Sequence, residues 1–209
     1  MAWRSSGVDA RRDPDTRLDG RRVSLRPLQL ADFHQWREVR LANASWLLPW
    51  EPSRPASAPD PVRDRDAFAI RCSARARDWQ LGTGYGFGIF VAERLVGEIN
   101  LNSVQRGAYQ NAYIGYWVDH RVAGNGYVPE ALVVLARFAF ERVGLHRVQV
   151  SIIPRNARSR RVADKLELRN EGIAERYLEI NGVWEDHIRY ALTREDWDER
   201  RAELAAAWL

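Results

Sequence analysis

The chain of 209 residues contains one cysteine, Cys72, and one lysine, Lys165. A single cysteine excludes an internal disulfide, and its place in a helical pattern favours a buried structural thiol over a nucleophile. No apolar run approaches the ~20 residues that a membrane-spanning helix requires. The first residues also lack the apolar segment of a secretory signal. We therefore expect a cytoplasmic protein with no membrane partner.

Two common phosphate-binding motifs are missing as well. The sequence has no GxGxxG, and no glycine loop is followed by lysine and then serine or threonine. These absences argue against a dinucleotide-binding site and against a nucleoside triphosphatase. The sequence also offers no convincing nucleophilic triad, and it implies no metal.

Composition and charge set only broad limits. Hydrophobic residues make up 45% of the chain, which is enough for a substantial core, and one α/β domain is the simplest partition. The net charge of +4 and the pI near 9.6 could indicate nucleic acid, an acidic partner or nothing in particular. Arginine carries nearly all the positive charge and often alternates with acids, as in residues 61–66. This spacing favours a solvated surface.

The most informative stretch is NAYIGYWVDHRVAGNGYVPEA, residues 111–131. β-Branched and aromatic residues predict a buried strand over 111–118, and helical spacing of apolar residues begins at Tyr127. The loop between them contains Gly124 and Gly126, which can adopt a positive φ. Such a loop, opening a helix, points several backbone N–H groups into one concavity that suits phosphate oxygens. The alternative is an ordinary strand-loop-helix connection.

The remaining predicted elements surround this strand-loop-helix unit. Residues 85–92 and 95–103 predict strands of an antiparallel meander, and residues 146–153 predict a strand parallel to 111–118. Asn181-Gly182 joins two final strands in a hairpin. Asp60 and Pro61 resemble a cap and first turn for a helix over 62–79. Further helices are expected over 31–42, 157–168 and from Thr193, whose pairing with Asp196 resembles a capping box.

At this point the sequence resembles a known family. RVAGNG matches the R/Q-x-x-G-x-G/A loop of the GNAT superfamily of acetyl-CoA-dependent N-acetyltransferases. GAYQNAYIGYW, GYVPEAL, PRNARS and YLEINGVWEDH resemble its RimJ/RimL branch, the ribosomal-protein alanine N-acetyltransferases, and the RimJ side is closer. The resemblance covers about 18–197. It implies a single-domain GNAT fold of the α/β (α+β) class, a mixed, mostly antiparallel sheet with a central parallel pair flanked by helices. Residues 1–17 would be a flexible tail and 198–209 the end of a C-terminal helix.

The resemblance also implies an activity. An amine would attack the thioester of acetyl-CoA directly, with a ribosomal protein's N-terminal alanine as the expected acceptor. Alternatives are a small-molecule amine acetyltransferase for polyamines or drugs, and a ribosome-assembly or RNA-binding factor that only binds acetyl-CoA. Ribosomal RNA beside such an acceptor would favour a protein with a positive net charge. The protein would be a monomer or a homodimer.

Residue roles follow from the matching motifs. Free N–H groups near Val118 would hold the thioester carbonyl if the central strand splays from its parallel neighbour, as is characteristic of the family. The expected cofactor-binding residues are Trp117, Val118, Asp119, Arg121, Val122, Ala123, Gly124, Asn125, Gly126, Tyr127, Asn156 and Ser159.

Two catalytic residues are expected. Many family members protonate the departing thiolate with a tyrosine on the helix after the second parallel strand, but residues 157–168 contain none. Ser159 matches the serine that serves this role in RimJ/RimL-type enzymes; the alternative is a helix-capping role. Glu98 is the first choice for a base acting through water, because an acid on a buried strand needs a partner or a purpose. Asp119 and His120 are its rivals.

The acceptor is expected to meet residues from three places. The candidates are Trp50, Asn100, Tyr177, Trp184 and Asp186. Trp50 belongs to an apolar segment that would either clamp a peptide terminus or seal the core, and the proline-rich residues 51–61 that follow predict a loop able to act as a lid. Cross-strand packing would explain Tyr177 and Trp184 equally well.

Overall fold

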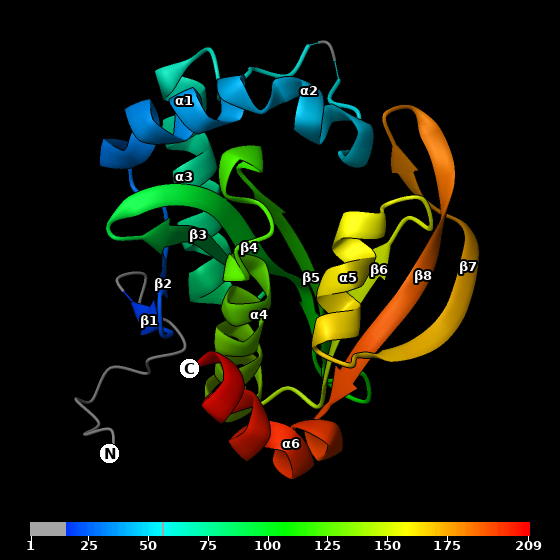
Figure 1. The fold of residues 1–209 in the computed structure, drawn as a ribbon. Helices are drawn as coiled ribbons and strands as arrows, with labels where there is room; N and C mark the ends of the chain where they lie inside the picture. The colour runs from blue at the N-terminus through cyan, green and yellow to red at the C-terminus, as the bar shows by residue number, and fades with distance from the viewer. Residues whose placement is uncertain (1–15, 56) are drawn as a thin grey trace.

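A computed structural model describes residues 16–55 and 57–209 (Figure 1). Its centre is an eight-stranded sheet in the order β1-β2-β3-β4-β5-β6-β8-β7. The strands are β1 Leu18–Asp19, β2 Val23–Arg26, β3 Tyr85–Val91, β4 Arg94–Gln105, β5 Asn111–Val118, β6 Arg147–Ile152, β7 Arg169–Ile180 and β8 Val183–Thr193. Within the described part, β5 and β6 run parallel and the other neighbours antiparallel. The mixed sheet with one parallel pair confirms the predicted fold.

Helices cover both faces of this sheet. They are η1 Leu30–Asp32, α1 Phe33–Ala42, α2 Ala44–Leu47, η2 Leu48–Trp50, α3 Arg65–Leu81, η3 His120–Val122, α4 Tyr127–Arg137, η4 Phe138–Val143, α5 Ala157–Lys165 and α6 Arg194–Trp208. Alternation along β4 sends Ile99 and Leu101 to the main core with α4, whereas Glu98 points toward α1 and α3. A smaller cluster of Phe33, Trp36, Phe68, Phe90 and Leu95 packs under α1 and α3. The central strands therefore separate two differently lined faces.

The predicted start of the second long helix was three residues early. Asp60 accepts a hydrogen bond from the N–H of Val62 and closes a turn. The N-cap of α3 is instead Asp64, whose side chain accepts from the N–H of Asp66. Both aspartates make the same local bond, so the sequence alone did not separate a turn from a cap.

Residues near both ends of the described chain take part in packing. The predicted tail lies outside the described residues up to residue 15. Thr16 is buried, and Arg17 forms ion pairs with Asp19 and Glu93. At the other end, Leu204 is buried in the main core. The end of α6 therefore packs against the main core.

The β7–β8 hairpin projects at one side of the molecule (Figure 1). Asn181 and Gly182 both have positive φ, as the predicted tight turn requires. The N–H of Asn181 donates to the carbonyl of Glu51 at 2.9 Å, and the Glu51 carboxylate pairs with Arg40. The proline-rich loop is thus attached at its first residue to the hairpin and to α1.

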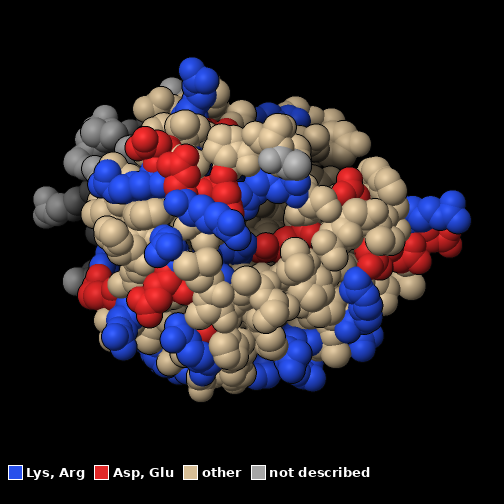
Figure 2. Space-filling view, turned by 90° about the horizontal axis from the view of Figure 1, so that it is seen from above, with Lys and Arg blue, Asp and Glu red and all other residues tan. Residues whose placement is uncertain are grey.

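Surface charge is mixed. On the face seen from above, Lys and Arg side chains alternate with Asp and Glu around a central hollow (Figure 2). This agrees with the solvated surface that the sequence indicated. In the described part of the chain, no helix combines the length and apolar character needed to cross a bilayer.

Candidate active site

The two parallel strands separate after a short contact. Only Asn111, Ala112 and Tyr113 of β5 pair with β6, although β5 continues to Val118 (Figure 1). The N–H of Asp119 donates to the carbonyl of Val96 in β4, and the carbonyl of Val118 accepts from the Trp46 indole on the opposite side. Because backbone groups alternate along a strand, the N–H groups of Tyr116 and Val118 face the opening toward β6. The sheet therefore has the splay that the resemblance implied.

The glycine loop lies at the end of β5. Gly124 and Gly126 have φ of +92° and +84°, and α4 begins at the next residue, Tyr127. A Cβ atom added to Gly124 would meet nothing within 4 Å. Open space in front of backbone N–H groups at a helix N-terminus suits a phosphate. The loop therefore fits the diphosphate of coenzyme A.

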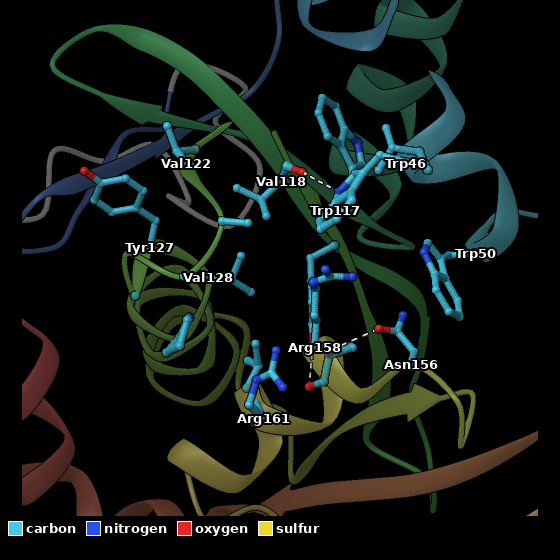
Figure 3. A pocket seen from close by; sticks show the side chains of 18 of the residues that line it. Trp46, Trp50, Trp117, Val118, Val122, Tyr127, Val128, Asn156, Arg158 and Arg161 are labelled. Carbon is cyan, nitrogen blue, oxygen red and sulfur yellow. Dashed lines mark hydrogen bonds between the residues drawn. The ribbon is translucent and has the colours of Figure 1, made fainter. Parts of the chain in front are cut away.

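Loop and splay open into one cavity of about 560 Å³ (Figure 3). Predicted residues among its lining are Trp50, Trp117, Val118, Val122, Ala123, Gly124, Gly126, Tyr127, Asn156 and Ser159. Figure 3 shows side chains from β5, α4 and α5 meeting there, with Trp46 and Trp50 closing one end. Sequence reasoning thus named half of this lining, although the residues come from five separate elements.

Asp119, Arg121 and Asn125 are not among the lining residues, and their hydrogen bonds connect the loop to its surroundings. Asp119 is buried and accepts hydrogen bonds from Arg121 and from the Asn43 amide. Burial alone would raise the pKa of Asp119, but these hydrogen bonds outweigh it and lower the pKa to about 2. The carbonyl of Asn125 accepts from Arg22 at 2.9 Å. For these three residues, direct contact with the cofactor remains a prediction.

We expect Asp119 to make stability pH-dependent. Its folded pKa is depressed, so its contribution is present above its unfolded value of 3.8 and is lost as pH falls through about 2. The shift corresponds to about 2 kcal/mol. Urea unfolding of the protein and of Asp119→Asn should differ by this amount at pH ~6 and converge near pH ~2. A difference that stays constant between these pH values would contradict the assignment.

Glu130 anchors the first turn of α4. It is 1% exposed and accepts hydrogen bonds from the N–H groups of Arg22 and Val23 and from the Arg22 guanidinium. Arg22 also lies over the Tyr127 ring at 5.1 Å. One buried carboxylate therefore connects β2, the glycine loop and α4.

The Glu130→Gln variant should unfold more easily by about 3 kcal/mol, because the buried carboxylate loses its charge while its donors remain. Urea unfolding measures this loss. Glu199→Gln, at an exposed position of α6, is the matched control and should stay within about 0.5 kcal/mol of the parent. Equal stability of the two variants would show that Glu130 does not anchor the helix.

The first residues of α5 form the lower wall of the cavity. The Asn156 side chain caps α5 by accepting from the N–H of Ser159 at 3.1 Å. The Ser159 hydroxyl lies 2.7 Å from that of Tyr116 on β5. Asn156 therefore caps α5, and this cap holds Ser159 at the cavity wall.

Several lining residues were missed by sequence reasoning. They are Trp46, Leu47, Glu51, Tyr116, Val128, Pro129, Arg158, Arg161, Val162 and Lys165. Arg158, Arg161 and Lys165 recur at positions i, i+3 and i+7 of α5, a spacing that places basic side chains on one helix face. That spacing could have identified these three residues from the sequence. Arg158 also lies 4.6 Å from the Trp46 ring centre.

Glu98 lies on the other face of the sheet. It accepts from Trp36 at 2.7 Å, from Trp117 at 3.3 Å and from Arg71 at 2.5 Å. Burial opposes ionisation, but Arg71 and the Trp36 indole outweigh it and lower the pKa of Glu98. This carboxylate lines a second cavity of about 260 Å³ and not the first. The role of Glu98 as a base acting through water stays a prediction. His120, the alternative candidate for the base, forms a hydrogen bond with the Asn43 side chain.

The predicted acceptor residues do not form one cluster. Trp50 lines the cavity beneath Arg155, which lies 5.0 Å from its ring. Asn100 is buried beside Glu98, and its side-chain oxygen has no hydrogen-bond partner among residues 16–55 and 57–209. The other three belong to the hairpin: Tyr177 packs edge-on to His187, Asp186 accepts from the N–H of Arg176, and Trp184 is 63% exposed. Contact with the acceptor remains a prediction for all five.

A splayed parallel pair followed by a glycine loop and a helix defines an acyl-CoA-dependent transferase class, and comparison with known proteins agrees. The profile described as "Acetyltransferase (GNAT) domain" matches residues 22–169. The chain is 33% identical to the probable N-acetyltransferase YjcK of Bacillus subtilis, over 86% of this chain and 98% of that protein. It is 30% identical to the [ribosomal protein uS5]-alanine N-acetyltransferase of Escherichia coli, over 88% and 94%.

Solved structures give the same result. Mycobacterium smegmatis RimJ in complex with CoA-disulfide superposes with a TM-score of 0.84 at 31% identity, covering 92% of this chain and 94% of that one. The chain belongs to the GNAT family of acetyltransferases. Within that family it is RimJ-like, and it is an acetyl-CoA-dependent N-acetyltransferase.

Proposed function

We propose that this enzyme acetylates the N-terminal α-amine of a protein, with the alanine of a ribosomal protein as acceptor. The similarity to the [ribosomal protein uS5]-alanine N-acetyltransferase carries the proposal, because it extends over 88% of this chain. The site is compatible with it. The cavity between β5 and α5 would hold acetyl-CoA, and the opposite face of β5, beneath α1 and α3, would receive the amine.

The cofactor half of the mechanism uses main-chain groups. The loop amides around Gly124 would bind the diphosphate, and basic side chains of α5 would add positive charge. The N–H groups of Tyr116 and Val118 would hold the thioester carbonyl and stabilise the oxyanion as the amine attacks. Ser159 would donate a proton to the departing thiolate.

The acceptor half needs a neutral amine. An N-terminal α-amine has a pKa near 8, so a substantial fraction is already neutral at neutral pH. Glu98 is ionised and held by three donors, so any proton that it receives would come through water. An α-amine makes a milder demand on this base than a lysine side chain would, because more of it is already neutral.

Acetyl-CoA consumption should be measured with three acceptor sets: peptides with a free N-terminal alanine, the same peptides with a blocked N-terminus, and polyamines. Mass spectrometry then locates the new acetyl group. We expect a single acetyl group on the α-amine of the free peptides and none on the blocked ones. Turnover confined to polyamines would establish a small-molecule acetyltransferase instead. Binding of acetyl-CoA without any turnover would indicate a binding protein.

A further inference from the structure

Tyr116 occupies a position that the proposed mechanism leaves unused. It lies on the part of β5 beyond the contact with β6, and its side chain lines the cofactor cavity. Its hydroxyl is 2.7 Å from the Ser159 hydroxyl, and either atom can be the donor. Among the described residues that contact the serine hydroxyl, Tyr116 is therefore the one that can supply a second proton.

Serine alone is a poor acid for this step. An alkyl hydroxyl is about as weak an acid as water, whose pKa is ~15.7, whereas a phenol has an ordinary pKa of ~10. Burial raises the pKa of Tyr116 to about 12, while the hydrogen bond with Ser159 lowers it. Even so, the phenol remains a far better proton source for a thiolate than an unassisted serine.

We propose that Tyr116 acts through Ser159 as the second member of the proton-donating pair, a positioning residue that replaces the tyrosine missing from α5. This inference rests on the proposed function. As the new C–N bond forms and the C–S bond breaks, the electron pair stays on sulfur. Sulfur takes the proton of the Ser159 hydroxyl, and the Ser159 oxygen takes the proton of Tyr116. The phenolate regains a proton from water before the next turnover.

The geometry of both partners supports this order. The Ser159 N–H is already bonded to Asn156, so the serine is fixed at the first turn of α5. Tyr116 is packed against the main core. Two rigid elements, β5 and α5, therefore hold the two hydroxyl groups in contact, and a donor pair needs such preorganisation.

The decisive variant is Tyr116→Phe, which keeps the ring and removes the hydroxyl. We expect kcat with acetyl-CoA to fall about 30-fold, less than the ~100-fold or more that a directly acting general acid contributes, because the Ser159 hydroxyl still reaches the sulfur. Calorimetry should give a Kd for acetyl-CoA within about threefold of the parent protein, because the backbone N–H is unchanged. The selenoester analogue of acetyl-CoA provides the second substrate. Its selenolate leaves without needing a proton, so the variant and the parent should turn it over at rates within about threefold.

Two further variants complete the test. Tyr116→Phe combined with Ser159→Ala should be no slower than Ser159→Ala alone, because the two hydroxyls act as one unit. Tyr85→Phe removes another buried tyrosine hydroxyl outside the cavity and should leave both rates unchanged. An equal loss on thioester and selenoester, or additive losses in the double variant, would overturn the relay. A parent protein that acetylates no amine would instead refute the proposed function.

Discussion

The Gly124→Asp variant is expected to bind acetyl-CoA about 100-fold more weakly than the parent protein. Gly124 has a φ of +92° and an open space in front of its Cα. A carboxylate there would occupy the concavity and repel the diphosphate. Aspartate tolerates positive φ better than most residues, so the fold should survive. Calorimetric titration with acetyl-CoA measures the change.

Gly107 offers a matched control. It has a φ of +67°, and a Cβ added to it also meets nothing within 4 Å, but it lies in the turn between β4 and β5 away from the cavity. Gly107→Asp should therefore cost similar backbone strain and leave acetyl-CoA affinity unchanged. Equal affinities in the two variants would mean that the Gly124 loop does not bind the diphosphate.

The second large effect is expected in turnover. Ser159→Ala should lower kcat about 100-fold, because the leaving thiolate loses its proton donor. The affinity for acetyl-CoA should change by less than about threefold, since the amides and the diphosphate contacts remain. Steady-state kinetics together with calorimetry separate the two quantities.

The control for this experiment is Ser103→Ala, at an exposed position of β4 that lines neither cavity. It removes a hydroxyl without touching the cofactor cavity, and its kcat should equal that of the parent protein. Unchanged kcat in Ser159→Ala would remove the serine from the mechanism. A loss of acetyl-CoA affinity as large as the loss of kcat would give Ser159 a binding role.

The local secondary structure around this site could be predicted, because each strand, loop or turn is encoded in neighbouring residues. β-Branched and aromatic residues predicted the strand over 111–118, and the two glycines predicted the loop that opens α4. The hairpin turn at Asn181-Gly182 and the capping box at Thr193 follow from equally local rules, and the structure confirms both. The splay came only from the family resemblance, since strand separation depends on which strands pair.

The features missed by sequence reasoning are contacts between distant segments. Tyr116 and Ser159 are 43 residues apart, and no spacing rule predicts that their hydroxyl groups meet. Glu98 was recognised as a buried acid with a purpose, but its donors come from α1, α3 and β5. The ionisation state of Glu98 depends on those donors, so the sequence alone could not determine it.

A crystal structure of the acetyl-CoA complex tests the central claim most directly. The account predicts diphosphate oxygens within about 3 Å of the backbone N–H groups of the Gly124–Gly126 loop. It also predicts the thioester carbonyl in the opening beside Val118. A coenzyme bound elsewhere, with this loop and the β5–β6 opening free of it, would contradict the account.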